Sequence, residues 1–293
     1  MLKIFFRKIF PPIFLDLYRY IRYKYIYIKY YSFFKKNRNL KNSMRGSRCF
    51  ILGSGHSIDS VDLIRLKNEN IIGLNSFSFH KDYKELVNSD HGLKQHVDTP
   101  LHEFRNKKVY ESYIDEVDNN NFSNVHYFFG IDDYQNNYID AFKQRGTHNK
   151  PNKNYIHCNI PFSKQIELTN DSYNCSKTIW SPKSSSNFAL FLALYQGFDE
   201  IYLLGVDHDH MNADPENVKA IKEGILTKEE TNKLKVLRKD NKKEKQTLHF
   251  LDLIDVIKPM EMIEDLFPKR VKNLSTRSIF YCHEVIDLDS IGL

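Results

Sequence analysis

The sequence predicts an α/β fold with a Rossmann-like, doubly wound and mainly parallel sheet, preceded by a basic aromatic N-terminal helix. Two observations lead to this prediction. Short apolar runs alternate with segments of helical spacing from residue 49 onward, which is typical of βαβ units. The runs are apolar at successive positions instead of every second one, as expected for strands that are covered on both faces.

Composition sets limits on the class of protein. The chain has 293 residues, of which 41% are hydrophobic and 27% charged, enough for one large domain with appendages. Its four cysteines lie far apart without a CxxC pair, which excludes a disulfide scaffold and a zinc ribbon and favours a reducing compartment. No run of 18 uncharged apolar residues is present, so no ordinary transmembrane helix is expected.

The positive charge of the chain is concentrated in its N-terminal arm, residues 1–48. The arm holds 13 Lys and Arg residues against the single acid Asp16, and it carries 13 of the 40 aromatic residues. The remainder has 30 basic and 36 acidic residues and is therefore mildly acidic. An acidic body argues against nucleic acid as the partner of the domain.

The arm has the pattern of a segment that lies in a membrane interface. Pro11 and Pro12 divide it into a short hook (2–10) and a predicted helix (13–36). Basic residues recur among aromatic and aliphatic ones, and each Lys or Arg near an anionic leaflet contributes roughly 1 kcal/mol. We favour an anionic membrane surface as its partner, which predicts a cytoplasmic protein held peripherally on the inner face of the cell membrane. Packing on the body or homo-oligomerisation is the second interpretation, and nucleic-acid binding is the third.

The body is expected to begin with a short strand and a glycine turn at 49–55, followed by a helix whose apolar face includes Val61, Leu63 and Leu66. Further elements follow in order. The expected strands are 71–75, 86–90, 125–129, 200–207 and 271–274, and the expected helices are 188–196 and 249–267. Residues 95–175 are either an acceptor-binding insertion or a surface excursion.

The C-terminal third suggests a mobile cover over the site. Residues 208–248 are polar and contain a charge run, which a solvated loop or a lid would both explain. We therefore divide the chain into the arm (1–48), a nucleotide-sugar-binding domain (49–207), a lid segment (208–248) and a C-terminal helix and strand that complete the nucleotide site (249–293).

Ligands of parallel sheets bind beyond the carboxyl ends of the strands. The residues that follow predicted strands are therefore candidate site residues. They are Gly53, Ser54 and Gly55 in the first turn, Asn75, Asp90 and Asp207 after later strands, and Ser275 and Thr276 after the last. Glycines permit close approach of the backbone to a phosphate or ribose. Because position 58 is Ile, the third glycine of the dinucleotide fingerprint is missing and a dinucleotide cofactor is disfavoured.

Four blocks in this order resemble a known group of enzymes. They are CFILGSGHS (49–57), IGLNSF (72–77), SSSNFALFLALYQGFDEIYLLGVD (184–207) and VKNLSTRS (271–278). The group is the bacterial sialyltransferases of glycosyltransferase family 42, together with the related 6-hydroxymethylpterin diphosphokinase MptE-like proteins. The resemblance covers most of residues 49–280, and residues 95–175 align poorly.

The resemblance implies a nucleotide-sugar glycosyltransferase. A sugar, with sialic acid or a related acidic sugar as the candidate, would pass from a CMP-linked donor to a surface-glycan or lipid-linked acceptor. It implies that the donor site includes the first glycine turn, Asn75, Asp90 and the pair Ser184 and Ser185, and that His249 is the general base. Two tyrosines that hold the leaving phosphate in that family are absent here, and His208 or His210 would replace them.

No cofactor is required under this interpretation, because the nucleotide sugar is a substrate. Asp207 and Asp209 flank His208 in an Asp-x-Asp pattern that would suit Mg²⁺ or Mn²⁺, but the resembling sialyltransferases need no metal and we favour none. Two alternatives stay open: pyrophosphate transfer from ATP to a pterin alcohol, and a non-catalytic scaffold in polysaccharide assembly.

Overall fold

A computed structural model of the chain describes most of its residues. The described residues are 12–74, 77–78, 80–99, 111, 114–115, 117–119, 122, 124–132, 138–159, 169, 171–180, 184–207, 256–275, 278 and 283–293.

A nine-stranded sheet forms the centre of this described part, in the order β6-β5-β4-β3-β2-β1-β7-β8-β9. Every neighbouring pair is parallel, which confirms the predicted fold class. The strands are β1 (Arg48–Leu52), β2 (Asn70–Leu74), β3 (Lys94–Asp98), β4 (Val125–Ile131), β5 (Lys153–Asn159), β6 (Thr178–Trp180), β7 (Glu200–Leu204), β8 (Val271–Asn273) and β9 (Glu284–Val285).

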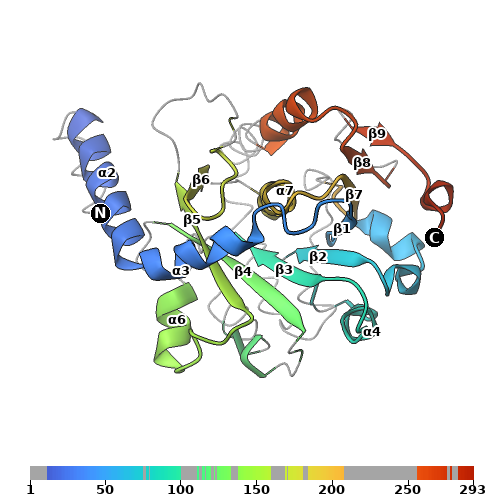
Figure 1. Cartoon of the computed structure of the whole chain (residues 1–293), viewed down its shortest axis with the longest axis horizontal. Coiled ribbons are helices and arrows are strands. Elements are labelled where there is room, and N and C mark those ends of the chain that lie inside the picture. Colours follow the sequence, from blue (N-terminus) through green and yellow to red (C-terminus); the bar gives the residue numbers. More distant parts are fainter. Residues whose placement is uncertain are drawn as a thin grey trace, which may run out of the picture.

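Helices cover both faces of the sheet (Figure 1). One face carries α7 (Ser185–Gln196) and the helix over 256–266. The other carries α4 (Tyr83–Val87), α6 (Tyr138–Gln144) and the short 3₁₀ turns η2 (His56–Ser60), η3 (Leu63–Leu66) and η6 (Leu288–Ile291). This two-sided covering is the doubly wound arrangement that the sequence predicts.

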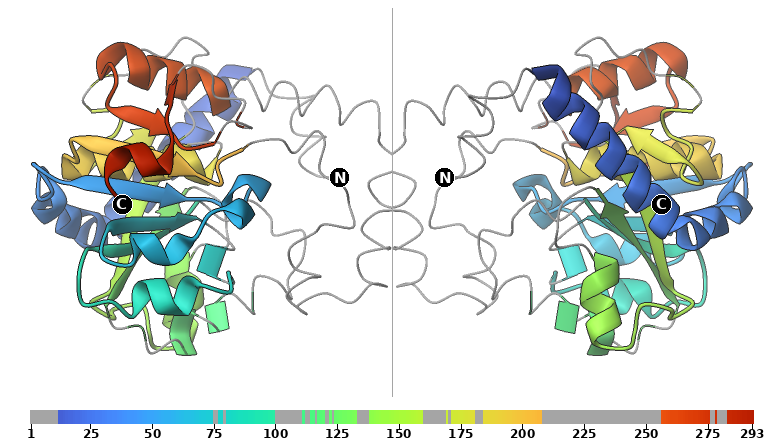
Figure 2. Two further views of the ribbon diagram at one scale, coloured as in Figure 1. Left: turned by 90° about the vertical axis from the view of Figure 1, so that its right-hand side faces the viewer. Right: turned by 90° about the vertical axis from the view of Figure 1, so that its left-hand side faces the viewer.

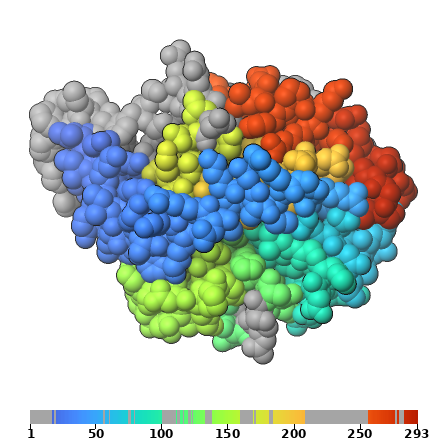
Figure 3. All heavy atoms as spheres, viewed as in Figure 1, coloured from blue at the N-terminus to red at the C-terminus, as the bar shows by residue number. Residues whose placement is uncertain are grey.

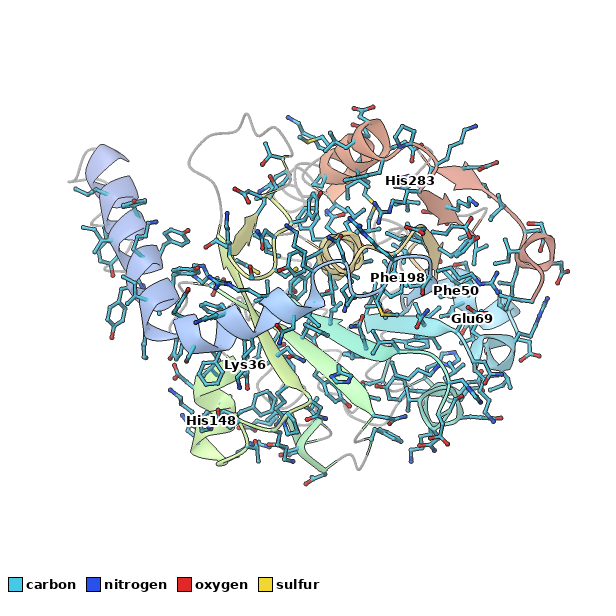
Figure 4. The ribbon with its side chains drawn as sticks, in the orientation of Figure 1. Lys36, Phe50, Glu69, His148, Phe198 and His283 are labelled. Atoms are coloured by element: carbon cyan, nitrogen blue, oxygen red, sulfur yellow. The ribbon has the colours of Figure 1, made fainter. Side chains whose placement is uncertain are left out.

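The strands are apolar on both faces because each face is buried. In β1, Phe50 and Leu52 belong to the core on one side of the sheet, and Cys49 and Ile51 to the core on the other side. Figure 4 shows Phe50 and Phe198 in the interior of the domain, surrounded by other side chains. All twelve residues of α7 are buried, as expected for a helix that packs over β1, β2 and β3.

Two of the expected elements differ from the sequence prediction, and strands β5, β6 and β9 were not expected. Residues 86–90 were expected to form the third strand, but Tyr83–Val87 is helix α4 and the third strand is β3. Its sequence, KQHVD, lacks an apolar run even though all five residues are buried, so periodicity does not identify it. The segment after the first glycine turn forms η2 and η3 instead of one α-helix, and the carboxylate of Asp62 caps η3 by accepting a hydrogen bond from the Ile64 amide.

Residues 95–175 contribute to the core of the sheet. They contain most of β3, together with β4, β5 and helix α6. Both alternatives considered for this region, an acceptor-binding insertion and a surface excursion, are therefore wrong for its described part.

The N-terminal arm is helical and packs on the body. It forms α2 (Pro12–Lys29), α3 (Tyr31–Lys36) and η1 (Asn37–Leu40), and Figure 3 shows it as a ridge that starts at the rim of the domain and continues across its surface. The Tyr30 hydroxyl donates to Asp140 (2.7 Å), and the side-chain amide of Asn37 donates to the carbonyls of Tyr155 and Cys175 (2.8 and 2.9 Å). Figure 4 places Lys36 and His148 at the same corner, where α3 meets the body. No helix in the described residues is long and apolar enough to span a bilayer.

Candidate functional site

The order of the strands reverses at β1, which has β2 on one side and β7 on the other. The chain runs outward from β1 to β6 and then returns to β7, so the loops after β1 and β7 leave the sheet beside each other. In open parallel sheets, the crevice at such a reversal is the usual ligand site. The topology therefore predicts a ligand site at the turns that follow β1 and β7.

These two turns are in direct backbone contact. The amides of Gly53 and Gly55 donate to the carbonyls of Leu204 and Gly205 over 2.8 and 2.7 Å. A Cβ atom on Gly53 would lie 2.1 Å from the Gly205 carbonyl oxygen, and one on Gly55 would lie 2.4 Å from a carboxylate oxygen of Asp207. Gly205 itself has a φ of +68°, in the left-handed region. In the described residues, these glycines contact the neighbouring turn. A larger residue would not fit there, and this close packing explains why glycine occupies both positions.

Asp207 joins the turns after β1, β7 and β8. Its carboxylate accepts hydrogen bonds from the Ser57 amide (2.8 Å), the Ser57 hydroxyl (2.5 Å) and the Ser275 hydroxyl (2.9 Å). Only 1% of Asp207 is exposed. We call Ser57, Asp207 and Ser275 the carboxylate clasp. It holds together three chain segments that are far apart in sequence.

The turn after β8 is itself held in place. The Ser275 amide donates to the side-chain oxygen of Asn273 (3.0 Å), and the Ser278 hydroxyl donates to the Val206 carbonyl (3.0 Å). Of the candidate site residues in this turn, Ser275 belongs to the clasp, while Thr276 lies outside the described residues. Ser54, the central residue of the first turn, is exposed.

The hydrogen bonds of the clasp are relevant to the alternative in which Asp207 binds Mg²⁺ or Mn²⁺. Both carboxylate oxygens of Asp207 already accept hydrogen bonds from this chain, so a cation would have to displace them. Among the residues that the structure describes, no group of three or more His, Cys, Asp or Glu side chains is arranged to hold a metal ion. His208, Asp209 and His210 lie outside those residues.

Ser184 begins α7 at the carboxyl edge of the sheet. Its hydroxyl accepts from the Asn187 amide (3.2 Å) and lies 2.8 Å from the Ser186 hydroxyl. The other end of α7 caps at Gly197, beside Asn42 at the amino edge. A helix of this length presents the positive end of its dipole, at Ser184 and Ser185, to the edge where the strands end. The structure therefore brings the predicted serine pair to the same edge as the clasp.

Asp90 does not belong to this edge. It was expected to follow a strand, but it precedes β3 and is exposed. The neighbouring Gly92 packs against the carbonyl of Glu69, just before β2 begins, so Asp90 lies at the amino edge. The position that Asp90 was expected to occupy is taken by Asp98, the last residue of β3, which is 8% exposed.

Two buried carboxylates of the carboxyl edge were not identified from sequence. Asp98 is the last residue of β3, Asp132 directly follows β4, and both are buried. The polar sequence of β3 gave no indication of Asp98, and the strand expected at 125–129 ended before Asp132. Asn75 and His249, which the resemblance singles out, lie outside the described residues.

A cavity of about 570 Å³ lies at the opposite, amino edge. It is lined by Arg45, Tyr173 and Arg270, among others, next to the C-terminal end of α7. The C-terminal end of a helix favours cations. None of the predicted site residues lines this cavity, so it is separate from the predicted site.

A comparison with solved structures finds a similarity to a bacterial sialyltransferase. The solved structure is the sialyltransferase CstII from Campylobacter jejuni, determined in complex with a substrate analogue, CMP-3FNeuAc. The match covers 82% of this chain and 86% of that chain, with 16% sequence identity and a TM-score of 0.43. Neither a scan against protein-family models nor a search of curated proteins finds a match.

Proposed function

We propose that this chain is a glycosyltransferase that uses a nucleotide-sugar donor bound at the carboxyl edge of the sheet. One observation carries the proposal. The four sequence blocks that resemble the sialyltransferases, although spread over residues 49–278, fall on the adjacent strands β2, β1, β7 and β8 and on the helix that leads into β7. Adjacent strands of a sheet are about 4.8 Å apart, so the carboxyl ends of these four strands lie side by side at one edge of the sheet.

The described residues suit a donor with a charged phosphate. The N-terminus of α7 attracts anions through its dipole and first-turn amides. The carboxylate clasp fixes the turns after β1, β7 and β8 relative to one another. A preorganised surface of this kind lowers the entropy that is lost when a nucleotide binds.

The finer assignments rest on the resemblance. CMP is the proposed nucleotide, and sialic acid or a related acidic sugar is the proposed sugar. His249 would remove the proton from the acceptor hydroxyl as the bond between the sugar and the phosphate breaks, and His208 or His210 would contact the departing phosphate. A histidine suits the general-base role because its ordinary pKa of about 6.5 lies close to a cytoplasmic pH.

Thermal unfolding in the presence of CMP, UDP, GDP or ATP tests the proposal. A ligand at a hundred times its Kd stabilises the folded state by about 2.7 kcal/mol, a rise in Tm of roughly 5–10 °C for a chain of this size. We expect CMP to produce such a rise and the other nucleotides to produce less. Stabilisation by ATP with Mg²⁺ alone would support pyrophosphate transfer instead, and no shift with any nucleotide would support a non-catalytic scaffold.

Turnover provides the second test. We expect release of CMP from CMP-sialic acid to depend on an added glycan acceptor. Binding of CMP without release of CMP from any CMP-linked sugar would reject the sugar assignment while preserving the nucleotide site.

A further inference from the structure

Helix α2 has two apolar faces, and the described part of the domain packs against one of them. Tyr23, Ile26, Tyr27 and Tyr30 face the body. Ile26 is 8% exposed and Tyr30 is 1% exposed, and the Tyr23 hydroxyl donates to the Thr178 hydroxyl (2.9 Å). Ile26 and Tyr27 follow Tyr23 by three and four residues, which places the three on one side of α2, and Tyr30 follows the end of the helix.

The opposite side of α2 is apolar and exposed. We define its outer face as Leu17, Tyr18, Ile21, Tyr25 and Ile28, which are 53%, 60%, 59%, 60% and 72% exposed. At 1.5 Å per residue this face extends over roughly 17 Å. Figure 2 (right) shows α2 on the outside of the domain. Soluble proteins seldom expose a continuous row of large apolar side chains without a binding partner.

Cations flank the outer face on both sides. At 100° per residue, Lys24 lies along one border and Arg22 and Lys29 along the other, and Lys24 and Lys29 are exposed. Residues 17–58 contain no Asp or Glu at all. The partner must therefore combine an apolar interior with negative charge at its surface.

We propose that the outer face of α2 docks on an anionic lipid bilayer. Leu17, Ile21 and Ile28 would enter the boundary between headgroups and acyl chains, Tyr18 and Tyr25 would lie at headgroup depth, and the flanking cations would contact anionic headgroups. A second copy of α2 is a poorer occupant because it would bring like charges together without an acid to pair them. Nucleic acid is also poorer, since it would leave the three aliphatic side chains without a partner.

The contacts of the inner face explain how such docking would hold the whole domain. Tyr23 stacks on His157 with ring centroids 4.9 Å apart, and Phe33 of α3 packs edge-on against Tyr155 of β5 at 5.3 Å. These contacts fix α2 and α3 to strand β5 near the end of the sheet. The outer face is thus carried on a rigid support, not on a free tail.

Cosedimentation of the full chain with vesicles tests the proposal. The vesicles are phosphatidylcholine alone, or phosphatidylcholine with roughly one-third phosphatidylserine. We expect binding to the anionic vesicles only, weakened as salt rises from about 0.1 to about 1 M because screening shortens the Debye length from about 10 to about 3 Å. No binding to anionic vesicles would overturn the proposal.

Two variants assign binding to this face. Ile21→Ser with Ile28→Ser should weaken partitioning at least about tenfold. The matched control, Leu266→Ser with Val285→Ser, changes two apolar side chains that are 48% and 50% exposed on another part of the surface, and it should bind as the unmodified chain does. Equal loss in both would contradict the assignment to α2.

A charge variant and a sedimentation measurement complete the test. Lys24→Gln with Lys29→Gln should weaken binding to anionic vesicles. We expect only a small loss of thermal stability, because both lysines are exposed and each lies over tyrosine rings of the arm. If Ile21→Ser with Ile28→Ser instead converts a dimer to a monomer while vesicle binding is unaffected, the occupant is a second copy and the lipid proposal is wrong. None of these measurements uses a nucleotide, so their failure is distinct from failure of the proposed function.

Discussion

The hydroxyl of Ser57 donates a 2.5 Å hydrogen bond to the carboxylate of Asp207, 150 residues later in the chain. This bond crosses the point where the strand order reverses, because Ser57 follows β1 and Asp207 follows β7. The Ser57 amide and the Ser275 hydroxyl donate to the same carboxylate. The arrangement stabilises the fold at the edge where we place the donor, so the stability of the domain and donor binding should depend on the same side chain.

Substitution of the clasp carboxylate should destabilise the domain. Asp207→Ala leaves three donors without their acceptor in a buried position, and we expect the free energy of unfolding to fall by about 2–4 kcal/mol. Urea unfolding measures this value. Asp90→Ala is the matched control, because Asp90 is exposed at the opposite edge and should change stability by less than about 0.5 kcal/mol. A similar loss in both variants would mean that the clasp contributes little.

Comparing Gly→Ala substitutions at two positions should separate the cost of a steric clash from the cost of backbone strain. Gly53→Ala would place Cβ 2.1 Å from a backbone oxygen of Gly205, so the turns after β1 and β7 must move apart. We expect a loss of about 3 kcal/mol and loss of the CMP-induced rise in Tm. Gly146→Ala is the control, since its φ is +70° but no atom lies within 4 Å of the added Cβ, and it should lose only about 1–2 kcal/mol. Normal CMP binding by Gly53→Ala would move the donor site away from this turn.

Removal of the proposed general base should slow turnover without affecting the fold. We expect His249→Ala to reduce the rate of acceptor-dependent CMP release by about 10²–10⁴-fold. The CMP-induced rise in Tm should persist, because a general base acts on the acceptor. His91→Ala, which removes an exposed histidine at the amino edge, should turn over normally. Near-normal rates in His249→Ala would exclude this residue from catalysis.

The stack between the arm and strand β5 predicts a specific pH dependence. Burial, followed by the charge of Lys24, lowers the pKa of His157 to about 3, whereas an unfolded histidine titrates near 6.5. Below about pH 6.5 the unfolded chain therefore binds a proton that the folded chain does not, and stability decreases as the pH falls toward 3. Above about pH 6.5, His157 is unprotonated in both the folded and the unfolded chain, so its titration no longer lowers the stability.

Unfolding in urea at pH 7 and pH 5 tests this prediction. For His157→Gln, which cannot titrate, we expect the loss of stability per pH unit to be smaller than in the unmodified chain by as much as about 1.4 kcal/mol. His91→Gln, which replaces an exposed histidine at the amino edge, is the matched control. An equal pH dependence in all three proteins would show that His157 does not contribute to it.

Strands with apolar sequences could be located from the sequence because their burial on both faces excludes polar residues. The predicted strands at 71–75, 125–129, 200–207 and 271–274 correspond to β2, β4, β7 and β8. Strand β3 could not be found in this way. Its Lys94 is buried, and the Nζ atom donates to the carbonyls of Lys67 and Glu69 at 2.7 Å, partners that exist only once the strand is in place.

The candidate site shows the same division. The rule that ligands bind where parallel strands end correctly brought Gly53, Gly55, Asp207 and Ser275 to one edge. It misplaced Asp90, because the rule depends on knowing where β3 begins and ends. It also did not show that the Asp207 carboxylate is already occupied by hydrogen bonds from Ser57 and Ser275.

The sequence by itself determined the parallel α/β class and the amphipathic, cationic character of the arm, because both follow from the local spacing of apolar and charged side chains. Only the tertiary structure decided which side of α2 is buried and which stays exposed. That choice depends on contacts with His157 and Thr178, more than 120 residues away in the chain. In the same way, it decided that Asp207 is a buried acceptor in a clasp, since a hydrogen-bond partner 150 residues distant has no signature in local spacing.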